Sequence, residues 1–170
     1  MVIRLSADAR KTVLPSAAQE ARRRGDRRLG TDHLLLGLLK DADSPVARAL
    51  GVDLETARTA LDGLDRSALA SVGVEVSHLG NPSSLGDQAQ PAHPRRLLPL
   101  TSGARAVIKT TVEQTRHTRT ARIETSQFLL ALLDRKSPDP AAELLTTLGV
   151  HRSQVRSKLQ TPADREQPDS

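Results

Sequence analysis

The side chains that most often catalyse reactions or hold metals are few in this sequence of 170 residues. The absence of cysteine excludes disulfides, thiolate metal sites and cysteine nucleophiles. The five histidines lack the His-Glu-x-x-His pattern and any other metal-ligand spacing: they are His33, His78, His93, His117 and His151. Asp41 and Asp43 are close together in a predicted loop, where we expect a solvated pair rather than an acid–base dyad. The sequence therefore predicts that the protein is not an enzyme.

One pair of glycines has the spacing of a phosphate-binding loop. Gly25 and Gly30 are five positions apart, but Thr31-Asp32 follows where a P-loop has Lys-Ser/Thr. An acidic side chain there would repel phosphate, and the lysine that reaches the phosphates is missing. We therefore predict no nucleotide, no metal and no other cofactor.

The densest group of charges is a run of arginines near the end of a predicted helix. Its members are Arg22, Arg23, Arg24, Arg27 and Arg28. Cations are favourable at a helix C-terminus, so a solvated helix end explains them. The alternative is a patch for an anionic partner, which the net charge of +5 also allows. A nucleic-acid-binding or regulatory helical protein is thus a second hypothesis, although with only Phe128 as an aromatic residue the chain has no stacking platform for bases.

An internal repeat organises the elements that must position these residues. Three segments of the first half recur in the same order in the second half: Leu5–Arg10 as Leu100–Arg105, Gly30–Leu39 as Glu124–Leu133, and Ala49–Val52 as Thr147–Val150. The nearly constant offset indicates a duplication. We predict a first repeat over residues 1–64, a linker over 65–99, a second repeat over 100–160 and a flexible tail over 161–170.

Each repeat is predicted to contain four helices. Ser6 is expected to cap the first, which runs towards Arg24 and which Pro15 should kink or shorten. Thr31 is expected to cap the second, which is apolar nearly all round and therefore central. The third begins at Ser44-Pro45 and ends at Gly51, and Asp53 caps the fourth.

The second repeat follows the same plan. Thr101, Thr125 and Asp139-Pro140 mark the first three helix starts, and His151 or Arg152 begins the last helix. Between the repeats, Asp65–Val72 is predicted to form a short extra helix, and residues 77–99 carry the proline and glycine of a loop.

The predicted fold class is all-α, with two tandem four-helix repeats in a pseudo-two-fold arrangement. A core without aromatic residues other than Phe128 must be built from Leu, Val, Ile and Ala, which favours helix-on-helix packing. No apolar run approaches the roughly 20 residues that span a bilayer. We expect a cytoplasmic protein.

The repeated segments resemble the Clp N-terminal repeat domain of the ClpA and ClpC unfoldases. The resemblance rests on Gly30–Leu39 and on the duplicated Leu-Ser/Thr-x-x-Ala-Arg start, and it covers about 5–64 and 100–159. It implies a non-catalytic module that binds peptides, substrate proteins or adaptors in Clp proteolysis. The expected partners are Clp unfoldase and protease components, adaptors, substrates or cyclic peptides. The sequence contains no ATPase module, so it resembles a free-standing Clp N-domain protein of actinobacterial type. Such a protein is expected to act as an adaptor, a decoy or a competitor of the unfoldase. The alternative is an N-terminal fragment of a Clp ATPase subunit.

The resemblance also implies two pockets for phosphorylated arginine. In each pocket an acid receives the guanidinium, while a hydroxyl residue and nearby amides hold the phosphate. The matching positions are Ser6 with Asp32 in the first repeat and Thr101 with Ser126 in the second. Because Ser126 has no charge, the first pocket is the better preserved.

A second site implied by the resemblance is an apolar surface for cyclic peptide antibiotics. Two phenylalanines anchor it in the family, and the matching positions here are Val2 and Leu100. Arg10 and Arg105 match basic positions at the same surface, and Leu5 completes the expected seam between the repeats.

Overall fold

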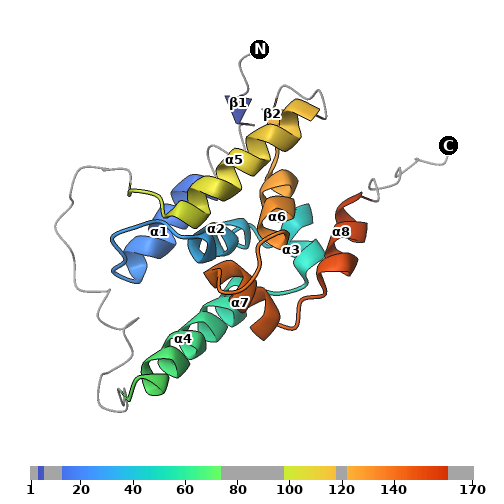
Figure 1. The fold of residues 1–170 in the computed structure, drawn as a ribbon. Helices are drawn as coiled ribbons and strands as arrows, with labels where there is room; N and C mark the ends of the chain where they lie inside the picture. Colours follow the sequence, from blue (N-terminus) through green and yellow to red (C-terminus); the bar gives the residue numbers. More distant parts are fainter. Residues whose placement is uncertain (1–3, 6–12, 74–97, 118–121, 161–170) are drawn as a thin grey trace.

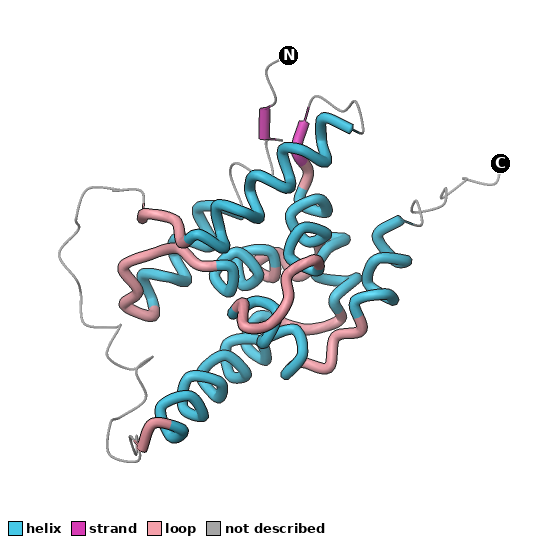
Figure 2. Tube along the Cα trace, in the orientation of Figure 1, coloured by secondary structure: helices cyan, strands magenta, loops and turns pink. Residues whose placement is uncertain are grey.

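The fold is described from a computed structural model over residues 4–5, 13–73, 98–117 and 122–160. The first repeat contains β1 (Arg4–Leu5), α1 (Leu14–Arg23), α2 (Thr31–Leu38), α3 (Pro45–Leu50) and α4 (Leu54–Ser71). The second contains α5 (Ser102–His117), β2 (Arg122–Ile123), α6 (Thr125–Leu133), α7 (Pro140–Thr147) and α8 (Arg152–Gln160). The predicted all-α class with four helices in each repeat is confirmed, and two very short strands are added to it (Figures 1 and 2).

The two repeats pack in a pseudo-two-fold arrangement. Helix α2 packs on α7 as α6 packs on α3, and α4 packs on α7 as α8 packs on α3. The equivalent helices α2 and α6 pack on each other in the middle of the molecule (Figure 1). The second, third and fourth helices of each repeat therefore meet the same kind of neighbour from the other repeat.

Short parallel backbone pairings join the repeats in the same symmetric way. β1 pairs with β2, with Leu5 opposite Ile123. On the other side Leu29 forms a parallel bridge with Leu100, and the amide of Thr101 donates to the carbonyl of Leu29 at 3.0 Å. In both cases the segment before the first helix of one repeat pairs with the segment before the second helix of the other.

The core is aliphatic, as the composition requires. Helices α2 and α6 supply most of the large side chains that are fully buried, and among them Phe128 of α6 is the single aromatic residue of the sequence. The largest members are Leu34, Leu35, Leu36, Phe128, Leu129, Leu132, Leu133, Leu144 and Leu145. This confirms that the two apolar helices are central.

The helix starts agree in part with the predictions. Asp53 accepts the amide of Thr56 at 2.8 Å and Thr101 accepts the amide of Ala104 at 3.2 Å, so both are caps as predicted. Ser44 caps α3 in the same way. The prediction that Thr31 caps α2 was wrong.

Residues one position earlier cap the two central helices. Gly30 is the N-cap of α2, and its amide donates to Nδ1 of His33 at 3.0 Å. Glu124 is the N-cap of α6, and its amide donates to Oε1 of Gln127 at 3.0 Å. A side chain three residues into each helix thus satisfies the capping amide, and Thr125, like Thr31, is the first helical residue rather than the cap.

Helix α4 is longer than predicted. The sequence indicated a helix ending near Leu64 and a separate short helix over Asp65–Val72, but α4 runs without a break from Leu54 to Ser71. Gly73, with φ of +78°, follows its end. The outer end projects from the body of the molecule and leaves Leu69 and Val72 exposed (Figure 1).

Helix α1 is described from Leu14, and Pro15 lies in the first turn of that range. The predicted cap at Ser6, the predicted loop and the predicted tail lie outside the described residues. Among the helices of the described ranges, none is both long and apolar enough to cross a membrane.

A buried ion pair fastens α4 to α1. The Glu20 side chain is 1% exposed, and it accepts from Nε of Arg58 at 3.0 Å and from Nη2 at 2.6 Å. Hydrogen bonding to Glu20 raises the pKa of Arg58 above its usual value, and Glu55 adds to the effect. The Arg58 guanidinium is therefore charged at neutral pH.

Candidate functional site: a charged cavity between the repeats

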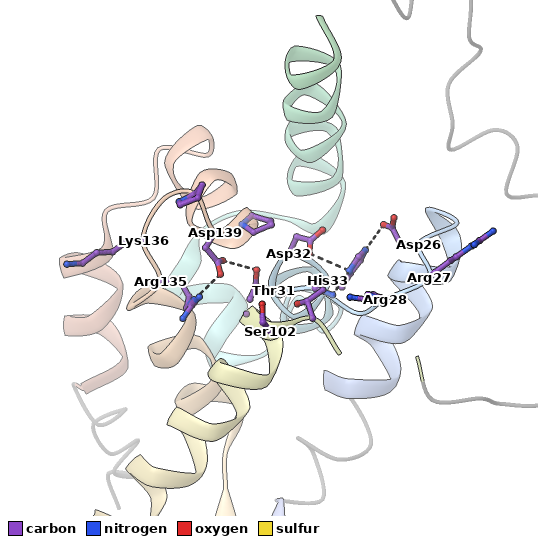
Figure 3. Close-up of a pocket in the computed structure, with 15 residues that line it drawn as sticks. Asp26, Arg27, Arg28, Thr31, Asp32, His33, Ser102, Arg135, Lys136 and Asp139 are labelled. Carbon is purple, nitrogen blue, oxygen red and sulfur yellow. Dashed lines mark hydrogen bonds and ion pairs between the residues drawn. The ribbon is translucent and has the colours of Figure 1, made fainter. Parts of the chain in front are cut away.

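A cavity of about 590 Å³ lies where the two repeats meet. Its walls come from the segment before α2, the first turns of α2 and α5, and the loop between α6 and α7 (Figure 3). Its charged lining residues are Asp26, Arg27, Arg28, Asp32, Arg135, Lys136 and Asp139. Carboxylates and cations therefore line the same cavity, which suits a ligand that carries both signs of charge.

One wall is held by a buried carboxylate that connects the repeats. Asp139 accepts the hydroxyl of Thr31 at 2.8 Å, its own helix amide at Ala141 at 3.1 Å, and Nε of Arg135 at 2.9 Å. Thr31 is 1% exposed and Asp139 is 8% exposed. Because these partners satisfy both carboxylate oxygens, Asp139 has a structural function in the wall.

The opposite wall contains a buried histidine with a defined tautomer. Nδ1 of His33 accepts the amide of Gly30, so in the neutral ring the proton is on Nε2. Nε2 lies 3.0 Å from Oδ2 of Asp26 and donates to it. His33 thus ties the start of α2 to the preceding loop, and it is not arranged as a metal ligand.

Asp32 is the carboxylate of the cavity that has the fewest partners. Its side chain is 13% exposed, and its Oδ1 lies 3.4 Å from Nδ1 of His33, which in the neutral ring has no proton to donate to it. No hydrogen bond to it is found within the described part of the chain. A Cβ at Gly30 would overlap Oδ1 of Asp32, so glycine is needed there for the carboxylate to fold back over the helix start. Asp32 is therefore placed to accept a cationic group from a ligand.

The structure pairs the predicted pocket residues across the repeats. Asp32 of the first repeat and Thr101 of the second line the same cavity, whereas Ser126 is not among its lining residues. The cavity therefore combines Thr101 with Asp32, and the pair of Thr101 with Ser126 stays a prediction. The backbone pairing of Leu29 with Leu100 brings the start of α5 beside the start of α2, which explains the combination. Ser6, predicted to accompany Asp32, lies outside the described residues.

The residues predicted for the apolar surface do not line this cavity. Leu5 and Leu100 lie in the two symmetric backbone pairings, and Leu100 is half-buried. Arg105 is exposed on α5. Val2 and Arg10 lie outside the described residues.

The arginine run is divided among different environments. Arg24 is 18% exposed and forms ion pairs with Asp26, Asp62 and Asp65. Burial alone would lower its pKa, but these carboxylates more than offset that effect and raise it. Arg23 approaches Glu20 at 4.0 Å. The run is thus not one continuous patch of free cations.

Arg27 and Arg28, by contrast, are exposed and line the cavity. Sequence reasoning missed Arg135, Lys136 and Asp139, the residues that the second repeat contributes. The only available signal was Asp139-Pro140, which was interpreted as a helix start and nothing more. Among the described residues, no group of histidine and carboxylate side chains could hold a metal ion.

Comparison with known proteins gives consistent matches. The sequence profile of the family described as the Clp repeat (R) N-terminal domain matches residues 4–148. The chain is 27% identical over 150 residues to the chaperone protein ClpC1 of Arabidopsis thaliana chloroplasts, and 27% identical to a ClpA homolog of Guillardia theta. Each alignment covers 86% of this chain, but only 14% and 16% of those proteins.

Among solved structures, the N-terminal domain of the chaperone ClpD from Arabidopsis thaliana is similar in fold. The TM-score is 0.66 at 21% sequence identity, and the match covers 95% of this chain and 96% of that one. The chain therefore has the fold of that domain.

Proposed function

The chain belongs to the Clp repeat N-terminal domain family, and from that membership and the charged cavity we propose that it is a non-catalytic module that binds protein segments in Clp proteolysis. The proposed partners are Clp unfoldase subunits, their adaptors and the proteins they process. The relatives are described as ATP-binding subunits of Clp protease or as Clp chaperones, and the chain spans about 14% of their length. The proposal concerns recognition only.

The proposed ligand is a side chain that carries a cation and an anion, as phosphorylated arginine does. The observation that supports it is the presence of Asp32 and Thr101 in one cavity. The Asp32 carboxylate would accept the guanidinium. The Thr101 hydroxyl already accepts the amide of Ala104, which leaves its proton free to donate to a phosphoryl oxygen.

The test is fluorescence polarisation with a labelled peptide that contains phosphoarginine, compared with the same peptide that contains arginine. Asp32→Asn keeps the shape of the side chain and removes its charge. Loss of one charge-assisted hydrogen bond is expected to weaken binding by about 10- to 100-fold. The matched control is Ser126→Ala at the equivalent position of the second repeat, which should leave the affinity unchanged.

Equal affinities of the wild type and Asp32→Asn would contradict the proposed site. The same titration at two salt concentrations separates the nucleic-acid hypothesis. Binding to nucleic acid through several phosphates falls steeply with salt, whereas a single side-chain pocket has a shallow salt dependence.

A further inference from the structure

Arg135 is the cation of the cavity whose orientation is fixed by a buried partner. Its Nε donates to Oδ2 of Asp139 at 2.9 Å, and the Asp139 side chain is 6% exposed. Asp139 is fixed in turn by Thr31 and by the amide of Ala141. The plane of the guanidinium is therefore set by a network that belongs to both repeats.

The two Nη groups of Arg135 have no hydrogen-bond or ion-pair partner within the described ranges. The side chain is 34% exposed, so these groups are open to a ligand. A guanidinium that is held through Nε and free at Nη presents two parallel donors, the geometry that matches a carboxylate or phosphoryl group.

Nη2 of Arg135 lies near the start of α5. The position that a Cβ at Gly103 would occupy is 3.8 Å from this nitrogen, 3.1 Å from Oδ2 of Asp139 and 3.2 Å from Cγ2 of Thr31. Ser102, directly before it, is exposed and lines the cavity. The first amides of α5 have no partner within their helix, so they add donors beside the guanidinium.

The other basic residues of the second-repeat wall are arranged differently. Figure 3 shows Lys136 extending away from the middle of the group, while Arg135 lies beside Thr31, Asp139 and Ser102. Lys136 has the same formal charge and lies next to Arg135 in the sequence, but no partner orients it within the described part of the chain. It is therefore a matched control for charge alone.

We infer that Arg135, oriented by Asp139, is the specificity-determining residue for the anionic end of the ligand. Together with Ser102 and the first amides of α5, it binds a tetrahedral oxyanion such as a phosphoryl group. The inference deepens the proposed function and rests on it for the identity of the ligand. Asp32 then recognises the cationic end and Arg135 the anionic end, each from a different repeat.

The experiment is an NMR titration of the whole ¹⁵N-labelled chain with two probes, inorganic phosphate and free phosphoarginine. The wild type is compared with Arg135→Gln and Lys136→Gln. We expect phosphate to shift the amides of Ser102 and Gly103 in the wild type and in Lys136→Gln. In Arg135→Gln the affinity for both probes should fall by about 10-fold or more, the effect of one lost charge-assisted contact.

Two results would overturn the inference: phosphate shifts of the same size in Arg135→Gln, or no phosphate-dependent shifts at these amides in the wild type. Its failure is distinguishable from that of the proposed function. If phosphate binding depends on Arg135 but phosphoarginine peptides do not bind, the anion subsite exists and the proposed ligand is wrong. If phosphoarginine binding depends on Asp32 but not on Arg135, the proposed ligand is right and the anion subsite at Arg135 is wrong.

A loss of binding through unfolding is excluded by a thermal melt of each variant. Asp139→Asn supplies an independent check, because its amide oxygen can still accept from Thr31 and Ala141, whereas its NH2 group cannot accept from Nε of Arg135. It should reduce phosphate affinity less than Arg135→Gln does. Binding unchanged in Asp139→Asn would contradict the orienting function of the carboxylate.

Discussion

Replacement of Gly37 by alanine should destabilise the fold, although alanine is the better helix former. Gly37 lies where α2 crosses α1, and a Cβ there would be 2.8 Å from the amide nitrogen of Ala17 and 2.8 Å from the carbonyl oxygen of Val13. Both atoms belong to the backbone of a packed helix, so no rotation of a side chain can relieve the overlap. The equivalent position of the second repeat is Ala131, which shows that α5 and α6 leave room for a methyl group.

The magnitude follows from two opposing effects. Alanine in a helix interior is favoured over glycine by about 1 kcal/mol. Forcing one extra carbon into a well-packed core costs about 1–3 kcal/mol, and more when backbone must move. Here two backbone atoms lie well inside the roughly 3.5 Å at which such atoms attract, so the helices must separate. We expect a net loss of about 1–3 kcal/mol in the free energy of unfolding.

The measurement is urea denaturation followed by circular dichroism. The matched control is Gly63→Ala in α4, where a Cβ would meet nothing within 4 Å and the helix is continuous. The same chemical change should there raise the free energy of unfolding by about 0.5–1 kcal/mol. If Gly37→Ala is as stable as Gly63→Ala, the close approach of α1 and α2 is not what requires glycine, and the reasoning fails.

Three further predictions concern polar contacts. Arg58→Ala leaves the buried Glu20 carboxylate without its main partner and should lower the free energy of unfolding by about 3 kcal/mol, measured in urea. Adding Glu20→Gln to Arg58→Ala should recover part of this lost stability. Thr31→Val removes the hydroxyl that donates to a buried carboxylate and should cost about 1–3 kcal/mol in thermal unfolding, whereas no change would show that the carboxylate finds another donor. Hydrogen bonds from the amide and hydroxyl of Thr56 lower the pKa of Asp53, so the cap stabilises the fold above the ordinary aspartate pKa and this stabilisation is lost as the pH falls below about 4. The difference in unfolding free energy between the wild type and Asp53→Ala should therefore shrink in that range. A difference that does not change with pH would contradict this prediction.

The repeat architecture could be predicted because local signals and long-range similarity agree. The apolar runs of α2 and α6, the proline-led starts of α3 and α7 and the stop at Gly51 each point to the same element in both copies. The prediction of the N-caps was less accurate. Thr31 has the chemistry of a cap, but its hydroxyl donates to Asp139, and a cap one residue earlier leaves the hydroxyl free to do so.

The break predicted after Leu64 shows the limit of propensity in a surface helix. Nothing in the sequence ends α4 before Gly73, and the ion pairs of Arg24 with Asp62 and Asp65 hold the middle of the helix beside the end of α1. Such contacts join residues about 40 positions apart, so no local pattern shows them. The helix was therefore predicted too short.

The composition of the cavity depends on a geometry that no single repeat contains. Asp32 could be singled out from its motif, but its neighbours Thr101 and Arg135 come from the other copy because Leu29 pairs with Leu100. A duplication invites the assumption that each copy holds its own site. The exchanged pairing makes this cavity composite, so a substitution in one copy alters a pocket that the other copy completes.

The two composite positions have diverged in the residues that could bind a ligand. At the start of α2 the chain has Asp32 and His33, and at the start of α6 it has Ser126 and Gln127. His33 and Gln127 have the same structural function, because each side chain accepts a hydrogen bond from the amide of its N-cap residue. The difference between the two residues therefore preserves the fold. The change from Asp32 to Ser126 has no such structural equivalence, because it removes the carboxylate that would face a cationic group. This pattern is expected when both copies of a duplicated site are kept for folding but only one copy is kept for ligand recognition. The proposed site therefore predicts one ligand for each chain, with Asp32 and Arg135 as the pair on which binding depends.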